Sequence, residues 1–230
     1  MPRQNRVTPF STLLADPARG LFMGNRGCLH DASGRIVRPF RGRLWIVCLT
    51  EFRGRRRALM QPGRYTELFF LDEAMAMAAG HRPCAECRRA DYLAFRQAWA
   101  AAGLDPAPRA PDIDLILHRA RLERQAQRRH LTEAAGLPDG TFVLGADGAA
   151  LLLVGRSALP YAPSGYLAAR PRPRGPVTVL TPAPFVAILA AGYRPLLHPS
   201  AQAAPKTSPP MSVGGQSPAA GAGQIAQEEP

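Results

Sequence analysis

The sequence has no apolar run near the ~20 residues that a membrane-spanning helix needs. Its first six residues, MPRQNR, lack the apolar core of a secretory signal peptide. Lysine is almost absent, since Lys206 is the only one, so that arginine carries nearly all of the positive charge. We therefore expect a cytoplasmic protein without a membrane partner.

Motifs of the common enzyme classes are also missing. The chain has no glycine-rich phosphate loop, no Ser/His/Asp set with a local signature and no pair of carboxylates at helical spacing. Cysteine is scarce, with four residues in 230. In a cytoplasmic chain these four favour metal ligands or buried thiols over disulfides.

Positive charge, in contrast, is abundant and lies mainly in the first half of the chain. The formal net charge is +12, and residues 1–100 carry 17 Arg against 8 Asp and Glu. A field of this sign attracts polyanions, so DNA or RNA is a candidate partner. The alternative is a compositional bias, because Ala, Arg, Pro and Gly are abundant, as a GC-rich genome would produce.

The pattern of apolar and turn-forming residues predicts an α+β fold in four successive parts. The first part combines a small zinc knuckle with a short antiparallel sheet, and a helical link follows it. A β-rich part comes next. The C-terminal stretch of Pro, Ser, Gly and Ala cannot build a core and is predicted to be disordered. The boundaries of the four parts are 1–102, 103–136, 137–199 and 200–230.

Local signals place the helices and strands within these parts. Asp72 is predicted to cap a helix over 73–79, and Gly80 to end it in a left-handed conformation. Asp147-Gly148 is a strong hairpin signal. The other predicted elements are strands at 44–52, 57–60, 66–71, 141–145, 150–154 and 176–180, and helices at 90–101, 112–135 and from Thr181, as its cap, to Gly192.

The most specific signal is a Cys-x2-Cys knuckle, Cys84 and Cys87, directly after a helix stop. This spacing is the usual half of a tetrahedral Zn²⁺ site. The other ligands must fold back over the knuckle, and the candidates are Cys48 on a predicted strand and His30 in a turn region. Cys28 competes for the same space and could replace either of them. Buried or free thiols, and an exposed His30, are the alternatives.

The segment of about residues 66–89 resembles the zinc-binding module of the bacterial Ada DNA-alkylation repair protein. It shares a strand ending in aromatics (LFFL), an acidic-Ala helix (DEA), and AAGHRP followed by CAEC. The resemblance implies that Cys84 and Cys87 bind zinc. The upstream Cys-x3-Cys of that family, which includes the methyl-accepting cysteine, is absent here. As a whole the chain resembles a group of uncharacterised bacterial proteins, which implies no activity.

A second candidate site is a cluster of arginines around a predicted hairpin turn. Each guanidinium can contact two phosphate oxygens, which gives salt-sensitive binding that is independent of base sequence. A solvated hairpin tip is the alternative. The candidate residues are Arg53, Arg55, Arg56, Arg57 and Arg64, with Arg88 and Arg89 at the start of the next helix as an extension.

Together these features predict a zinc-binding protein that contacts nucleic acid through an arginine-rich surface. An enzyme related to alkylation repair, or a metal-assisted hydrolase, is the first alternative. In the hydrolase, Glu86 would be the candidate general base, although a solvated side chain is the simpler expectation at that place. A protein-interaction module in the β-rich part is the second alternative.

Overall fold

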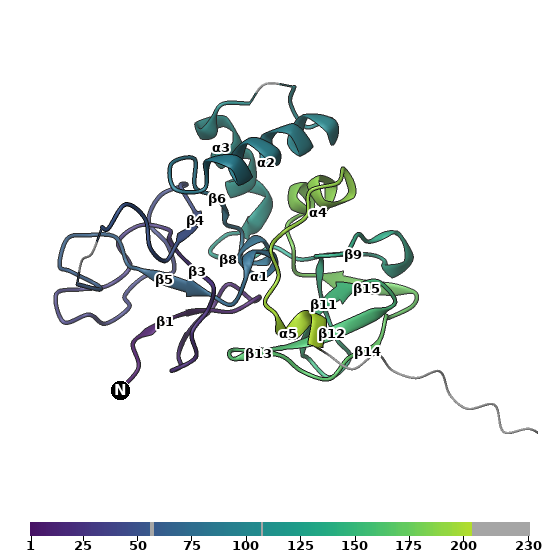
Figure 1. The fold of residues 1–230 in the computed structure, drawn as a ribbon, viewed down its shortest axis with the longest axis horizontal. Coiled ribbons are helices and arrows are strands. Elements are labelled where there is room, and N and C mark those ends of the chain that lie inside the picture. The colour runs from purple at the N-terminus through teal and green to yellow at the C-terminus, as the bar shows by residue number, and fades with distance from the viewer. Residues whose placement is uncertain (56–57, 107, 204–230) are drawn as a thin grey trace, which may run out of the picture.

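The computed structural model describes residues 1–55, 58–106 and 108–203. Its helices and strands confirm the predicted α+β class. Figure 1 shows one sheet on the left and a second sheet on the right, with helices gathered above and between them. No helix in these ranges combines the length and the apolar character needed to cross a membrane.

The first sheet consists of six short strands. They are β1 (Gln4–Val7), β2 (Leu13–Ala15), β3 (Phe22–Asn25), β4 (Ile46–Leu49), β5 (Leu68–Phe70) and β6 (Arg82–Pro83). Their order across the sheet is β2-β1-β5-β3-β4-β6. The sheet is mixed, because β3 pairs antiparallel with β4 and β5 while β1 runs parallel to β5 and β4 parallel to β6. Strands β4 and β5 thus occupy the central residues of the strands predicted at 44–52 and 66–71.

One strand prediction for this part is wrong. Residues 58–60 contain no strand, because the chain turns there and Met60 adopts a positive φ of 57° that an extended strand does not allow. Arg57, the first residue of that prediction, and its neighbour Arg56 lie outside the described residues. The described residues between β4 and β5 form no second strand of a hairpin.

Helix α1 (Glu73–Ala78) begins at the predicted residue and ends one residue before the predicted end, and this end positions the cysteine knuckle. The Oδ1 atom of Asp72 accepts a hydrogen bond of 2.9 Å from the Met75 N–H, which caps the first turn. Gly80 has a φ of +87° and ends the helix. A Cβ atom at this place would lie 2.7 Å from Cδ of Arg121, so glycine also permits this close approach. The chain then enters β6 alongside β4.

The second sheet has seven strands, and a hairpin lies at its centre. They are β9 (His130–Glu133), β10 (Phe142–Leu144), β11 (Ala150–Val154), β12 (Ser157–Ala162), β13 (Gly165–Tyr166), β14 (Arg170–Pro171) and β15 (Pro176–Val179). The predicted hairpin around Asp147-Gly148 joins β10 and β11, and β15 was also predicted. Strands β9 and β12 to β14 were not.

The predicted helix over 112–135 is too long. Helix α3 (Ala110–Arg121) ends at a tight hairpin of β7 (Leu122–Glu123) and β8 (Ala126–Gln127). The chain then continues as β9, which pairs with β15 along four residues. This long-range strand pairing outweighs the local preference for a helix.

Helices α2 (Arg89–Ala101) and α4 (Ala183–Ala190) pack against each other above the sheets (Figure 1). The apolar stripe predicted on α2 is buried in their common core, as Tyr92, Phe95 and Trp99 are at most 4% exposed. The predicted cap of α4 is wrong. The hydroxyl of Thr181 accepts a hydrogen bond of 2.9 Å from the Phe142 N–H, and the cap position falls on Pro182 instead.

The C-terminal prediction is corrected at its first residues. Residues 200–203, predicted to be disordered, form the short helix α5 (Ser200–Ala203). The Ser200 hydroxyl accepts a hydrogen bond of 2.8 Å from the Tyr166 N–H, which ties this helix to the second sheet. The rest of the predicted disordered tail lies outside the described residues.

Candidate metal centre

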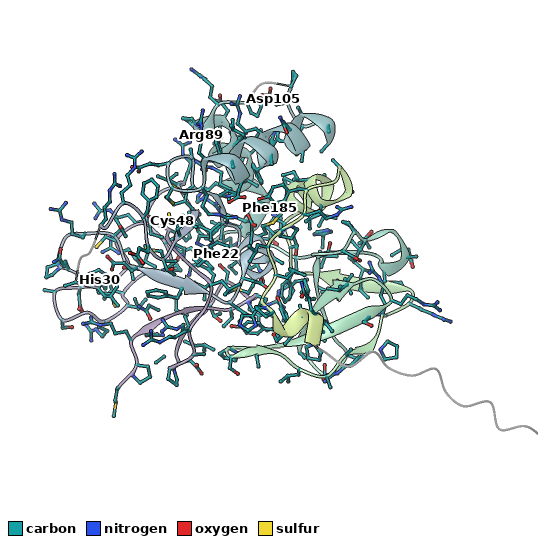
Figure 2. The ribbon with its side chains drawn as sticks, in the orientation of Figure 1. Phe22, His30, Cys48, Arg89, Asp105 and Phe185 are labelled. Atoms are coloured by element: carbon teal, nitrogen blue, oxygen red, sulfur yellow. The ribbon has the colours of Figure 1, made fainter. Side chains whose placement is uncertain are left out.

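Three cysteines from two segments of the first sheet lie together. Cys48 is on β4, and Cys84 and Cys87 are in the turn between β6 and α2. The Cys84 N–H donates a hydrogen bond of 2.9 Å to the Val47 carbonyl, which fixes the knuckle beside Cys48. The three Sγ atoms all lie within 4.8 Å of one another and could hold a metal ion. Figure 2 shows Cys48 close to the centre of this part of the molecule.

Hydrogen bonds distribute the protons among the three sulfur atoms. A bond from the Cys48 thiol, assisted by the N–H groups of Cys87 and Glu86, lowers the pKa of Cys84 to about 5 against the effect of burial. The Cys48 thiol also lowers the pKa of Cys87. Because Cys48 donates in both bonds, its own pKa is raised. The hydrogen bonds thus favour loss of the proton from Cys84 and from Cys87, and metal binding likewise requires deprotonated thiols.

His30, predicted as a ligand, is not part of this group. Its Nε2 lies 3.1 Å from the Gln61 carbonyl, to which it can only donate, and its Nδ1 therefore accepts from the Thr66 hydroxyl at 2.6 Å. Both ring nitrogens are thus engaged, and Figure 2 shows His30 at the edge of the molecule, away from Cys48. The alternative ligand Cys28 donates to the His30 carbonyl over 3.6 Å and is also outside the group.

A cavity of about 540 Å³ adjoins the three cysteines, which form part of its wall. No other His, Cys, Asp or Glu in the part of the chain that the structure describes joins the three sulfur atoms at the same spacing. One face of a bound ion would therefore be open to the cavity. The other lining residues are Met23, Asn25, Ile46, Leu49, Thr50, Phe52, Arg55, Leu59, Tyr65, Glu67, Glu86 and Phe69.

Two carboxylates of this wall are held by hydrogen bonds of their own. Glu67, which the sequence pattern did not single out, is buried and accepts from the Met60 N–H at 2.7 Å. Glu86 is exposed and pairs with Arg55 at 2.7 Å, and this hydrogen bond lowers its pKa. Glu86 therefore agrees with the simpler expectation of a solvated side chain.

Among the described residues, the arginines predicted to bind nucleic acid divide into an exposed group and a single buried residue. Arg53, Arg55, Arg64 and Arg89 are exposed, and Arg55 lies at the wall of the cavity next to the cysteines. The guanidinium groups of Arg53 and Arg55 lie over the ring of Phe52, at 5.0 and 5.5 Å from its centroid.

The prediction for Arg88 is wrong. Its side chain is 2% exposed and forms ion pairs with Glu73 at 2.9 Å and with Asp91 at 2.8 Å. The first turn of α2 turns Arg88 toward α1, whereas its neighbour Arg89 remains at the surface. Arg88 is therefore part of the interior.

Comparison of the chain with protein-family models, with curated proteins and with solved structures finds no match. The resemblance of residues 66–89 to the Ada zinc module accordingly stays a prediction from the sequence. The fold and the site define an α+β protein with a cluster of three cysteines at the wall of a cavity.

Proposed function

We propose that this chain binds one zinc ion through Cys48, Cys84 and Cys87 and keeps one coordination position open to the adjoining cavity. The main support is that the three sulfur atoms lie within 4.8 Å of one another at the wall of a cavity. No fourth ligand of this kind joins them among the described residues. Structural zinc sites have four protein ligands, whereas reactive ones have three and an exchangeable fourth ligand. The arrangement therefore favours a zinc centre that meets a substrate.

The number of thiolates favours one kind of chemistry at this centre. Three thiolates outweigh the two charges of the zinc ion, so the complex carries a net negative charge. Such a centre acidifies bound water less than a centre of neutral ligands does, but its sulfur atoms stay electron-rich and nucleophilic. Acceptance of an alkyl group by one of these three thiolates is thus better supported than hydrolysis. The Ada module does not supply this assignment, because its methyl-accepting cysteine has no counterpart in this chain.

The test is metal analysis of full-length protein purified without chelator, followed by replacement of zinc with cobalt. We expect about one zinc ion per chain and a cobalt spectrum with thiolate charge-transfer bands and tetrahedral d–d bands. Added imidazole should shift the d–d bands, because it can enter the open position. Folded protein without metal would contradict the proposal, and a spectrum that no added ligand changes would indicate four protein ligands.

A second candidate function is contact with nucleic acid at the mouth of the same cavity. It is supported by the exposed arginines Arg53, Arg55, Arg64 and Arg89, of which Arg55 reaches the cavity wall beside the cysteines. Phosphate groups bound there would bring a DNA or RNA strand close to the metal centre.

We expect the double substitution Arg53→Glu and Arg64→Glu to weaken DNA binding by about tenfold or more and to reduce its salt dependence. Arg55 is left intact because it pairs with Glu86. The matched control is the double substitution Arg156→Glu and Arg174→Glu, at two exposed arginines in loops of the second sheet. Binding to a duplex and to a single strand is measured over a range of salt concentrations. An equal loss in the control would show a general effect of net charge and contradict an arginine site at the cavity.

A further inference from the structure

The structure buries four arginines among the described residues, and two of them form no ion pair there. Arg82 pairs with the carboxylate of Asp114 through two bonds of 2.8 Å, and Arg88 is paired as well. Arg121 forms no ion pair, but the negative charge of Asp114 still acts on it. Arg26 has neither an ion pair nor such an acid within the described residues. A buried charge without a counter-charge is unfavourable, so Arg26 calls for an explanation.

Arg26 is held in place by neutral groups alone. Its two terminal nitrogens donate to the Ser11 hydroxyl at 2.7 Å and to the Ser11 carbonyl at 3.0 Å. Its Nε has no hydrogen-bond partner within the described chain, although the residue is only 2% exposed. Burial lowers the pKa of Arg26 to about 10, so the guanidinium is still charged at neutral pH. Within the described residues, the charge of Arg26 thus has no counter-charge, and its Nε–H group has no acceptor.

Arg26 forms part of the wall of a second cavity, of about 910 Å³, which shares no lining residue with the cavity at the cysteines. The exposed side chains of Arg38 and Arg129 lie along the same wall. Glu123 is the only acidic residue among the lining residues, so that three arginines against one glutamate leave a formal charge of +2. The polar part of this cavity is therefore suited to a dianion.

The remaining wall is aromatic and apolar. Trp45 and Phe40 contact each other with ring centroids 5.5 Å apart, and both line the cavity. The guanidinium groups of Arg26 and Arg121 lie over the Trp45 ring, at 4.8 and 3.9 Å from its centroid. Two guanidinium groups thus meet at one ring, and Asp114 offsets part of the charge of Arg121, which does not line the cavity.

We propose that this cavity binds a small phosphomonoester whose body is planar or apolar. The phosphate dianion would be bound by Arg38 and Arg129 and attracted by the charge of the buried Arg26, and the body would rest on Phe40 and Trp45. Arginine matches the geometry of phosphate oxygens through paired N–H donors. A volume of about 910 Å³ suits one small molecule, so a free phosphomonoester is favoured over a polynucleotide.

The experiment titrates AMP, inorganic phosphate and a single-stranded oligonucleotide into the full chain by calorimetry. AMP should bind in a saturable manner and more tightly than phosphate, because phosphate alone has no body to contact the aromatic wall. The double substitution Arg38→Glu and Arg129→Glu should weaken AMP binding by about tenfold or more, since both side chains are exposed and line the cavity. The double substitution Arg156→Glu and Arg174→Glu, which changes the net charge by the same amount, should leave it unchanged.

A second measurement addresses Arg26 itself. AMP should raise the melting temperature of the wild type, because a ligand that binds only the folded state stabilises it. This increase should be lost in Arg26→Met, and if that variant does not fold, the Arg38/Arg129 double variant should lose the increase. Absence of saturable binding of AMP and phosphate to the wild type would overturn the proposal. Binding of the oligonucleotide alone, or equal AMP affinity in the double variant and the wild type, would also overturn it.

Discussion

Replacing Cys84 with serine is expected to lower the zinc affinity of the protein by about a hundred- to a thousandfold. Structural zinc sites with four ligands bind with about 10–16 kcal/mol, which corresponds to about 3–4 kcal/mol for each ligand. Cys84 is the sulfur whose pKa is lowered to about 5, since it accepts from the Cys48 thiol and from backbone N–H groups of the knuckle. Its loss leaves Cys48 and Cys87, which cannot enclose the ion. The affinity is measured by competition with a chromophoric chelator.

The matched control for this change is Cys28→Ser. Cys28 is half-buried, as Cys48 and Cys87 are, but its thiol donates to the His30 carbonyl and lies outside the group of three. This variant should keep its zinc and its melting temperature. A chelator should lower the melting temperature of the wild type and of Cys28→Ser but not that of Cys84→Ser, because only a bound ion contributes stability through its binding. Equal zinc loss in Cys28→Ser and Cys84→Ser would contradict the assignment of the site.

Features that depend on neighbouring residues in the chain could be predicted from the sequence. Asp72 caps α1 and Gly80 ends it because each acts on the turn next to it. The position of Cys84 and Cys87 follows from that helix end. Cys48 was also predicted, because it lies on an apolar segment that had to belong to the same small sheet.

Features that depend on distant partners could not be predicted in this way. His30 was a reasonable ligand by residue type, but Thr66 and Gln61, more than thirty positions away, engage its ring. The helix predicted over 112–135 ends early because β9 finds a partner in β15. In each case the deciding contact is long-range, and neither composition nor periodicity contains it.

The cavity at Arg26 is a further example of a long-range feature. The sequence places Arg26 in what looks like a turn, Gly24-Asn25-Arg26-Gly27, whereas Gly24 and Asn25 belong to β3. Arg26 follows β3 directly and lies in the interior beside Trp45. Trp45 belongs to the loop before β4. Only the folded arrangement shows that this arginine is buried and that it lacks an acid.

Arg88 and Arg89 provide the sharpest test of how the interior is built, because they are adjacent in sequence and opposite in environment. We expect Arg88→Ala to lower the free energy of unfolding by about 3–5 kcal/mol, as for other buried ion pairs that lose one partner. Removal of Arg88 leaves the carboxylate of Glu73, which is 2% exposed, without its counter-charge. Arg89→Ala, at an exposed position, should change the stability by no more than about 0.5 kcal/mol.

The destabilisation should extend to the C-terminal part of the chain. Glu73 also accepts hydrogen bonds from the Tyr193 hydroxyl at 2.6 Å and from the Leu196 N–H at 3.0 Å, and it thereby joins α1 to the segment that follows α4. Urea unfolding measures the loss, and hydrogen exchange should show faster opening around residues 193–196 in Arg88→Ala. If the variant is too unstable to purify, Arg88→Met combined with Glu73→Gln should recover part of the stability, because no buried charge is then left unpaired. Equal stability of the Arg88 and Arg89 variants, with DNA binding lost in the first alone, would instead return Arg88 to the surface role that the sequence suggested.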